Sequence, residues 1–191
     1  MTNHNPIIIA LDVDSADEAR RIVKLTGDAC RFYKVGMELY AAAGMEFVRG
    51  LIAGGNDVFL DMKFYDIGET VKRAVAQVAK AGVKLLTVHG SLAVMQAARE
   101  GRGDSSLQLL GVTVLTSFDE SDLKQLGYPC SVSDLVELRV RNAVAAGIDG
   151  IVCSPLEVAR VREITGPGMI LVTPGVRSAG SGAGDQKRVA T

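Results

Sequence analysis

The chain has 191 residues, of which 48% are hydrophobic, and it carries 21 basic and 22 acidic side chains. This length and composition allow a sizeable core, so we expect one domain spanning residues 1–191. The balanced charge gives no basic stripe for nucleic acid, and no apolar run reaches the ~18 residues of a membrane span. We therefore expect a cytoplasmic protein that binds small molecules and has no membrane or nucleic-acid partner.

Short apolar or β-branched runs alternate with amphipathic segments along the chain. The predicted strands cover residues 7–13, 32–36, 58–63, 85–89, 109–115, 150–153 and 170–173. The predicted helices cover residues 16–26, 39–53, 69–81, 92–99, 133–146 and 156–164. Near-continuous apolar strands that alternate with helices indicate a parallel sheet that is covered on both faces.

Polar or charged residues end nearly every predicted strand. They are Asp12, Lys34, Asp61, Lys63, His89, Thr116, Ser117, Ser154 and residues 173–177. A doubly wound open sheet would spread these side chains along an edge, whereas a TIM (β/α)8 barrel gathers them into one mouth. No glycine-rich dinucleotide fingerprint follows the first strand, so we predict an α/β protein with a TIM barrel. Only seven strand-helix units are readable, and we expect the C-terminal eighth β/α unit to be missing from residues 1–191.

The stretch from Asp61 to Asp66 places two carboxylates and an ammonium at the end of an apolar strand. Because side chains alternate along a strand, Asp61 and Lys63 should point to the same face, with Asp66 in the following turn. Crowded charges cost desolvation energy, which favours a functional site over a core position. The structural alternative is a helix cap at Asp61 or Asp66 that Lys63 neutralises.

The few cysteines and histidines limit other chemistries. Cys30, Cys130 and Cys153 lie far apart and lack the spacing of a zinc site or a disulfide scaffold, so we interpret them as reduced packing residues. His4 and His89 are the only imidazoles, which argues against a Ser-His-Asp triad and a multi-histidine metal site. We expect His89 to be a structural hydrogen-bond donor.

A glycine-rich loop, residues 178–186, follows the seventh predicted strand. Barrels often hold phosphate with the loops after strands seven and eight. The backbone N–H groups of such a loop can converge on an anion, and Arg177 and Gln186 can add side-chain donors. A plain tail is the alternative, but Arg177 directly after residues 173–176 favours phosphate.

In this order along the chain, these segments resemble the orotidine 5'-phosphate decarboxylase family. The matching segments are Ala10-Leu11-Asp12, Lys34-Val35-Gly36, residues 61–67, Thr87-Val88-His89, and residues 112–117, 172–177 and 184–186. The D-x-K-x-x-D pattern alone is shared by a wider superfamily, but the ordered set is specific and spans the whole chain.

The resemblance implies cofactor-free decarboxylation of orotidine 5'-monophosphate (OMP) to UMP and CO2 in pyrimidine synthesis. It makes Lys63 the proton donor to the C6 carbanion, with Asp61, Lys34 and Asp66 completing the catalytic set. It implies substrate-binding roles for Asp12, Lys34, Asp61, Thr70, Thr116, Pro174, Arg177 and Gln186. Lys34 is expected to hold Asp61 in place, and Asp66 and Thr70 to reach into the neighbouring site of a homodimer. Neither a metal nor another cofactor is expected.

Three expectations qualify this reading. The family places a further strand with a phosphate-contacting Gly-Arg pair after the residues present here, so we expect weak activity from residues 1–191 alone. A sugar-phosphate enzyme of the same superfamily, with a magnesium-bound enediolate, is one alternative, but such enzymes carry a carboxylate where this chain has Lys34. A catalytically silent nucleotide-binding barrel is the other, and the retained set of crowded charges argues against it.

Overall fold

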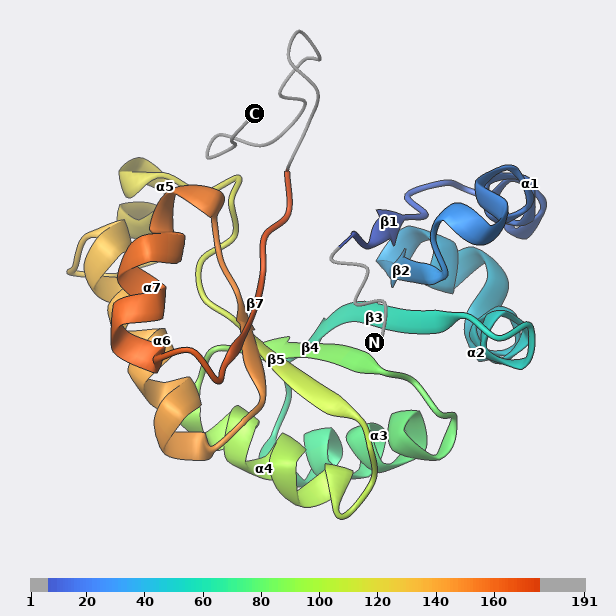
Figure 1. Ribbon diagram of the computed structural model, residues 1–191. Helices are drawn as coiled ribbons and strands as arrows, with labels where there is room; N and C mark the ends of the chain where they lie inside the picture. Colours follow the sequence, from blue (N-terminus) through green and yellow to red (C-terminus); the bar gives the residue numbers. More distant parts are fainter. Residues whose placement is uncertain (1–6, 176–191) are drawn as a thin grey trace, which may run out of the picture.

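The computed structural model describes residues 7–175 and contains one sheet of parallel strands (Figure 1). The strands pair in sequence order from β1 to β7, so each strand lies beside its chain neighbours. They are β1 (Ile9–Ala10), β2 (Phe32–Gly36), β3 (Asp57–Phe64), β4 (Leu85–His89), β5 (Gln108–Val112), β6 (Gly150–Val152) and β7 (Ile170–Val172). The sheet curls until β7 rises opposite β1 and β2 (Figure 1). The predicted barrel is confirmed in this curled, open form, with seven parallel strands and helices that alternate with them within residues 7–175.

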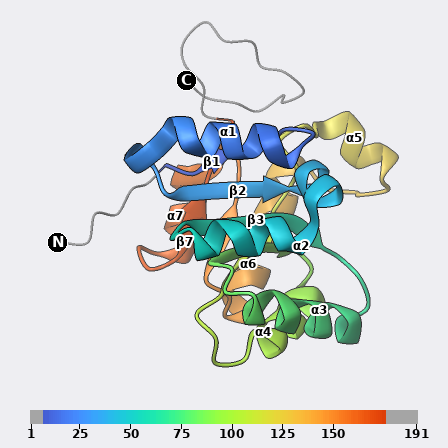
Figure 2. The same cartoon turned by 90° about the vertical axis from the view of Figure 1, so that its right-hand side faces the viewer.

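Helices lie on the outer, convex side of the sheet (Figure 1). They are α1 (Ala16–Thr26), α2 (Met37–Ala53), α3 (Gly68–Lys80), α4 (Leu92–Arg102), α5 (Glu120–Gln125), α6 (Val132–Ala146) and α7 (Val158–Thr165), with 3-10 turns η1 (Gly27–Ala29) and η2 (Pro155–Glu157). Figure 2 shows α1 and α2 flanking β2. In the part of the chain that the structure describes, no helix is long and apolar enough to cross a membrane.

Local sequence explains where several helices begin and end. The helix α6 starts at a capping box, in which Ser131 Oγ accepts from the Asp134 N–H at 3.1 Å and the Asp134 carboxylate accepts from the Ser131 N–H at 3.3 Å. It ends at Gly147, whose φ of 65° is a left-handed conformation that glycine adopts without strain. The helix α5 was missed by the sequence analysis because its six residues are too few to show a helical period.

Two of the predicted strands end three residues earlier in the structure than the sequence pattern predicts. The prediction of residues 7–13 became Ile9–Ala10, and that of residues 109–115 became Gln108–Val112. Leu11 and Val114 are nevertheless buried, at 0% and 3% exposure. The apolar pattern continues past the strand ends because these side chains still pack in the core there. Similarly, the predicted helix 156–164 begins as the 3-10 turn η2 before α7.

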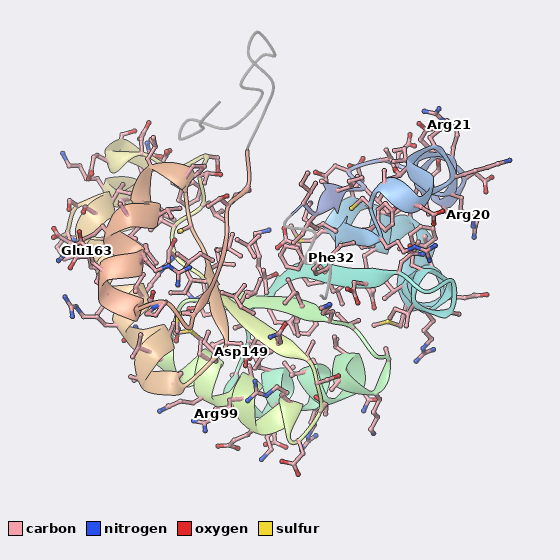
Figure 3. All side chains as sticks on the ribbon, viewed as in Figure 1. Arg20, Arg21, Phe32, Arg99, Asp149 and Glu163 are labelled. Carbon is pink, nitrogen blue, oxygen red and sulfur yellow. The ribbon has the colours of Figure 1, made fainter. Side chains whose placement is uncertain are left out.

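Alternation along the strands divides the apolar side chains into two clusters. Outward residues such as Tyr33, Leu60 and Ile151 join the main core under the helices. Inward residues form a smaller cluster, in which Phe59, Leu85 and Leu110 are buried and Ile8, Phe32, Val152, Ile170 and Val172 pack around them. Figure 3 labels Phe32 of this inner cluster. Because Phe59 faces inward, the period of two carries Asp61 to the same inner side.

Candidate active site

A cavity of about 870 Å³ occupies the inner side of the curled sheet. Its polar lining contains Asp12, Lys34, Asp61, Lys63, Thr116, Ser117 and Thr173, with Pro174 beside them. Its apolar lining includes Ile8, Phe59, Val112, Val152 and Val172 from the inner face of the strands. Charges therefore sit on one part of the wall and hydrocarbon on another, an arrangement that suits a ligand with a charged and an apolar portion.

The centre of the charged wall is the ion pair of Lys63 and Asp61. Lys63 Nζ lies 2.9 Å from both Asp61 carboxylate oxygens. The two side chains are 33% and 17% exposed, so the pair is partly removed from water yet open to the cavity. Thr87, on β4, donates its hydroxyl to Asp61 Oδ1 at 2.8 Å. The spacing predicted for Asp61 and Lys63, on one face of the strand, is thus what the structure shows.

The backbone of Lys63 has an unusual conformation. Its φ is 49°, and it is the one non-glycine residue with positive φ in residues 7–175. This conformation costs a non-glycine residue about 1–2 kcal/mol. It occurs in a bulge, because Leu60 pairs with Leu86 and Phe64 with Val88, so that residues 61–63 lie opposite Thr87 alone. The N–H of Lys63 leaves the strand ladder and donates to Thr87 Oγ1 at 2.9 Å.

Lys34 lies across the cavity wall and pairs with Asp12. Lys34 Nζ is 2.6 Å from Asp12 Oδ1, and the two side chains are 20% and 62% exposed. The expected hydrogen bond from Lys34 to Asp61 is not formed between these two described side chains. Asp61 is bonded by Lys63 and Thr87 instead. Strand register does not decide between the two carboxylates, since Lys34 lies opposite both Ala10 on β1 and Phe59 on β3, each two residues before an aspartate. Both Asp61 oxygens are instead taken by Lys63.

The other predicted site residues divide into three groups. Thr116 and Pro174 line the cavity. Asp66 and Thr70 are exposed and do not line it, and Asp66 Oδ1 accepts from the Ile67 N–H at 2.6 Å. Arg177 and Gln186 lie outside the described residues, as does the glycine-rich loop.

The sequence analysis missed Thr87 as a functional residue. Thr87 is fully buried, at 0% exposure, in a strand whose other residues 85–88 are apolar and buried. A polar side chain in such a strand, on the inward face set by Leu85, was the feature that could have identified it.

His89 does not behave as the predicted structural donor at Nδ1, because this buried atom has no hydrogen-bond partner among the described residues. Its ring packs against Tyr65 instead, with the centroids 4.1 Å apart. Burial, and secondarily the positive charge of Arg139, lowers the pKa of His89 to about 4. The imidazole is therefore neutral at pH 7 and serves as an apolar support under the loop after β3.

No group of three or more His, Cys, Asp or Glu side chains within residues 7–175 is arranged to hold a metal ion. The charged wall consists instead of two carboxylate–ammonium pairs. A wall of this kind can place positive charge and an acidic proton beside a bound ligand.

Comparison with known proteins adds family information. A family model described as the orotidine 5'-phosphate decarboxylase / HUMPS family matches residues 5–191. The orotidine 5'-phosphate decarboxylase of Nitrobacter winogradskyi is 51% identical over 185 residues, which cover 97% of this chain and 77% of that protein. The protein of the same name from a Methylobacterium species is 49% identical over 194 residues, covering 100% and 82%. The crystal structure of orotidine 5'-phosphate decarboxylase from Lactobacillus acidophilus superposes with a TM-score of 0.82 at 35% identity, covering 90% of this chain and 81% of that one.

Proposed function

Because this chain belongs to the orotidine 5'-phosphate decarboxylase / HUMPS family, we propose that it converts OMP to UMP and CO2 without a cofactor. The observation that carries the proposal, beside family membership, is the ammonium of Lys63 held at 2.9 Å from the Asp61 carboxylate on the cavity wall. An acidic proton and a fixed negative charge lie side by side there, and the reaction needs both.

Loss of CO2 from C6 of the pyrimidine leaves a localised carbanion on an sp2 carbon. Such a carbanion gains little from resonance, so catalysis depends on positive charge and a proton delivered to that atom. The Lys63 ammonium on the cavity wall can supply both, and Asp61 holds it in place. We assign Lys63 as the proton donor to C6.

Asp61 has a second proposed role through its charge. Beside the substrate carboxylate it would repel that group by about 4 kcal/mol, for unit charges ~4 Å apart at an effective dielectric of 20. The repulsion ends as neutral CO2 leaves, while the attraction between Lys63 and the developing carbanion grows. The interaction energy of the site therefore favours the transition state over the bound substrate.

The remaining cavity residues fit binding roles. Asp12 and Lys34 form a pair of hydrogen-bonding groups suited to ribose hydroxyls. We assign contacts with the base to Thr116 and Pro174, which also line the cavity. We assign phosphate contacts to Arg177 and Gln186, on the basis of the family resemblance. Contacts to a remote phosphate supply binding energy that orients the reacting ring.

We also propose that the active protein is a homodimer with composite sites, to which Asp66 and Thr70 of one subunit contribute in the other. Both residues are exposed, and neither lines the cavity of its own chain. Large apolar side chains surround Asp66 in an exposed state, with Tyr65 at 68% and Ile67 at 73%. A second copy of the chain would cover this apolar surface.

The test is the absorbance change when OMP is added to the purified protein in EDTA. We expect conversion to UMP that is lost, by at least about 1,000-fold in kcat, in Lys63→Ala, because the proton donor is removed. Failure of the folded wild-type protein to convert OMP overturns the proposal. Turnover of a sugar phosphate that requires magnesium would instead support the alternative enzyme of the same superfamily.

A further inference from the structure

We propose that Thr87 is a positioning residue for the Lys63–Asp61 pair, a role that rests on the decarboxylation proposed above. Thr87 does not line the cavity, so it acts through its two neighbours rather than on substrate. Its single hydroxyl accepts from the Lys63 N–H at 2.9 Å and donates to Asp61 Oδ1 at 2.8 Å. One side chain on β4 thereby fixes the backbone of the proton donor and the carboxylate that holds its ammonium.

The bonds close into a ring. Lys63 Nζ donates to Asp61, Asp61 accepts from the Thr87 hydroxyl, and that hydroxyl accepts from the backbone N–H of Lys63. Each member thus restrains the other two. The hydroxyl is also the acceptor for a backbone N–H that the bulge has removed from the strand ladder. Without it, the positive φ of Lys63 has no bond to hold it against relaxation.

Chemistry at C6 depends on where the Lys63 ammonium sits. A misplacement of about 1 Å can cost about 100-fold in rate even when it arises away from the reacting atoms. Thr87 is fully buried, so water cannot replace its hydroxyl when the side chain is changed. Loss of the hydroxyl should therefore lower kcat while leaving the ligand-binding residues of the cavity in place.

The experiment compares Thr87→Val, which keeps the shape and removes the hydroxyl, with Thr87→Ser, which keeps the hydroxyl. We expect kcat to fall about 100-fold in Thr87→Val and to stay within about threefold of wild type in Thr87→Ser. KM for OMP and the dissociation constant for UMP should change by less than about threefold in both, because Thr87 itself does not line the cavity.

Thr113→Val is the matched control. Thr113 is 1% exposed, and its hydroxyl donates to the Val152 carbonyl at 3.1 Å, away from Lys63 and Asp61. A loss of kcat in Thr113→Val equal to that in Thr87→Val would overturn the proposal, because it would reflect general loosening of the strands. Wild-type kcat in Thr87→Val would overturn it as well. If Thr87→Val does not fold, the comparison is made between Thr87→Ser and Thr87→Ala. Equal kcat in those two variants would also overturn the proposal.

A readout without turnover separates this proposal from the proposed function. Crystal structures of the variants should show Lys63 near its φ of 49° in Thr87→Ser and outside the positive region in Thr87→Val. An unchanged Lys63 backbone and ammonium position in Thr87→Val overturns the positioning role whether or not OMP is converted. Absence of turnover by the wild-type protein overturns the decarboxylase assignment instead.

Discussion

Lys34, in the middle of β2, pairs with Asp12, two residues beyond the end of β1, and Lys34 Nζ lies 2.6 Å from Asp12 Oδ1. A carboxylate and an ammonium held this close present a fixed pair of hydrogen-bonding groups to the cavity. In the proposed mechanism this pair serves substrate binding, and the pair of Lys63 and Asp61 serves proton transfer.

Asp12→Asn should therefore affect binding more than chemistry. We expect KM for OMP to rise about 10-fold, because a charge-assisted hydrogen bond is weakened at an exposed position, and kcat to change less than about threefold. Steady-state kinetics measure both. Asp14→Asn is the control, since Asp14 is an exposed carboxylate nearby that does not line the cavity. A large fall in kcat with unchanged KM in Asp12→Asn would contradict the binding role.

The composite site can be tested by mixing two inactive variants, Lys63→Ala and Asp66→Asn. In a mixed dimer, the site that retains Lys63 receives Asp66 from the other subunit. Equal mixing with exchange of subunits should restore about a quarter of wild-type activity, because half of the dimers are mixed and one of their two sites is complete. If Asp66 acts in its own chain's site, mixing restores nothing, and that result would rule out the composite arrangement.

His89 should make stability depend on pH. Burial first, and Arg139 second, lowers its folded-state pKa from 6.5 to about 4. In the unfolded chain this imidazole binds a proton below pH 6.5, whereas in the folded chain it stays neutral down to about pH 4. The free energy of unfolding therefore falls as the pH drops from 6.5 to about 4. The gap corresponds to about 3 kcal/mol in full, and partial exposure of the ring reduces the expected effect to about 1 kcal/mol.

The measurement is urea unfolding at pH 7 and pH 4.5 of the wild type and His89→Gln. Between pH 7 and pH 4.5, the free energy of unfolding of the wild type should fall by about 1 kcal/mol more than that of His89→Gln. Carboxylates titrate in both proteins and cancel in this comparison. A difference that is the same at both pH values would show that His89 is not kept neutral by folding.

Close packing of α3 against α4 depends on Gly101. A Cβ at this position would collide with the backbone of Lys72 on α3, which cannot move like a flexible side chain. Gly101→Ala should lower the free energy of unfolding by about 1–3 kcal/mol through overpacking. Gly50→Ala is the matched control within α2, where a Cβ meets nothing within 4 Å. It should raise stability by about 0.5–1 kcal/mol because alanine favours the helix. Equal effects of the two substitutions in thermal unfolding would contradict the packing argument.

The sequence by itself determined the alternation of strands and helices, since a period of two or of 3.6 depends on neighbouring residues alone. Lys34, predicted at a strand end, instead lies in the middle of β2. The sequence also determined that Asp61 and Lys63 share a face, and that Asp12 and Thr116 follow strands of a parallel sheet. These are local properties, and residues at the ends of parallel strands meet at one edge whatever the details of packing. Helix α5 was not predicted, because its six residues are too few to show a helical period.

Only the tertiary structure decided which charges pair and how the proton donor is held. Lys34 bonds Asp12 rather than Asp61, although β2 lies between β1 and β3, because Lys63 takes both Asp61 oxygens. Thr87 reaches Asp61 from β4, and Lys63 takes a positive φ, because residues 61–63 bulge opposite a single residue of that strand. Register and bulges are relations between segments more than 20 residues apart in the sequence, as in the bond from Lys63 to Thr87. No period within either strand encodes them, so the geometry of the site emerges only when the strands pair.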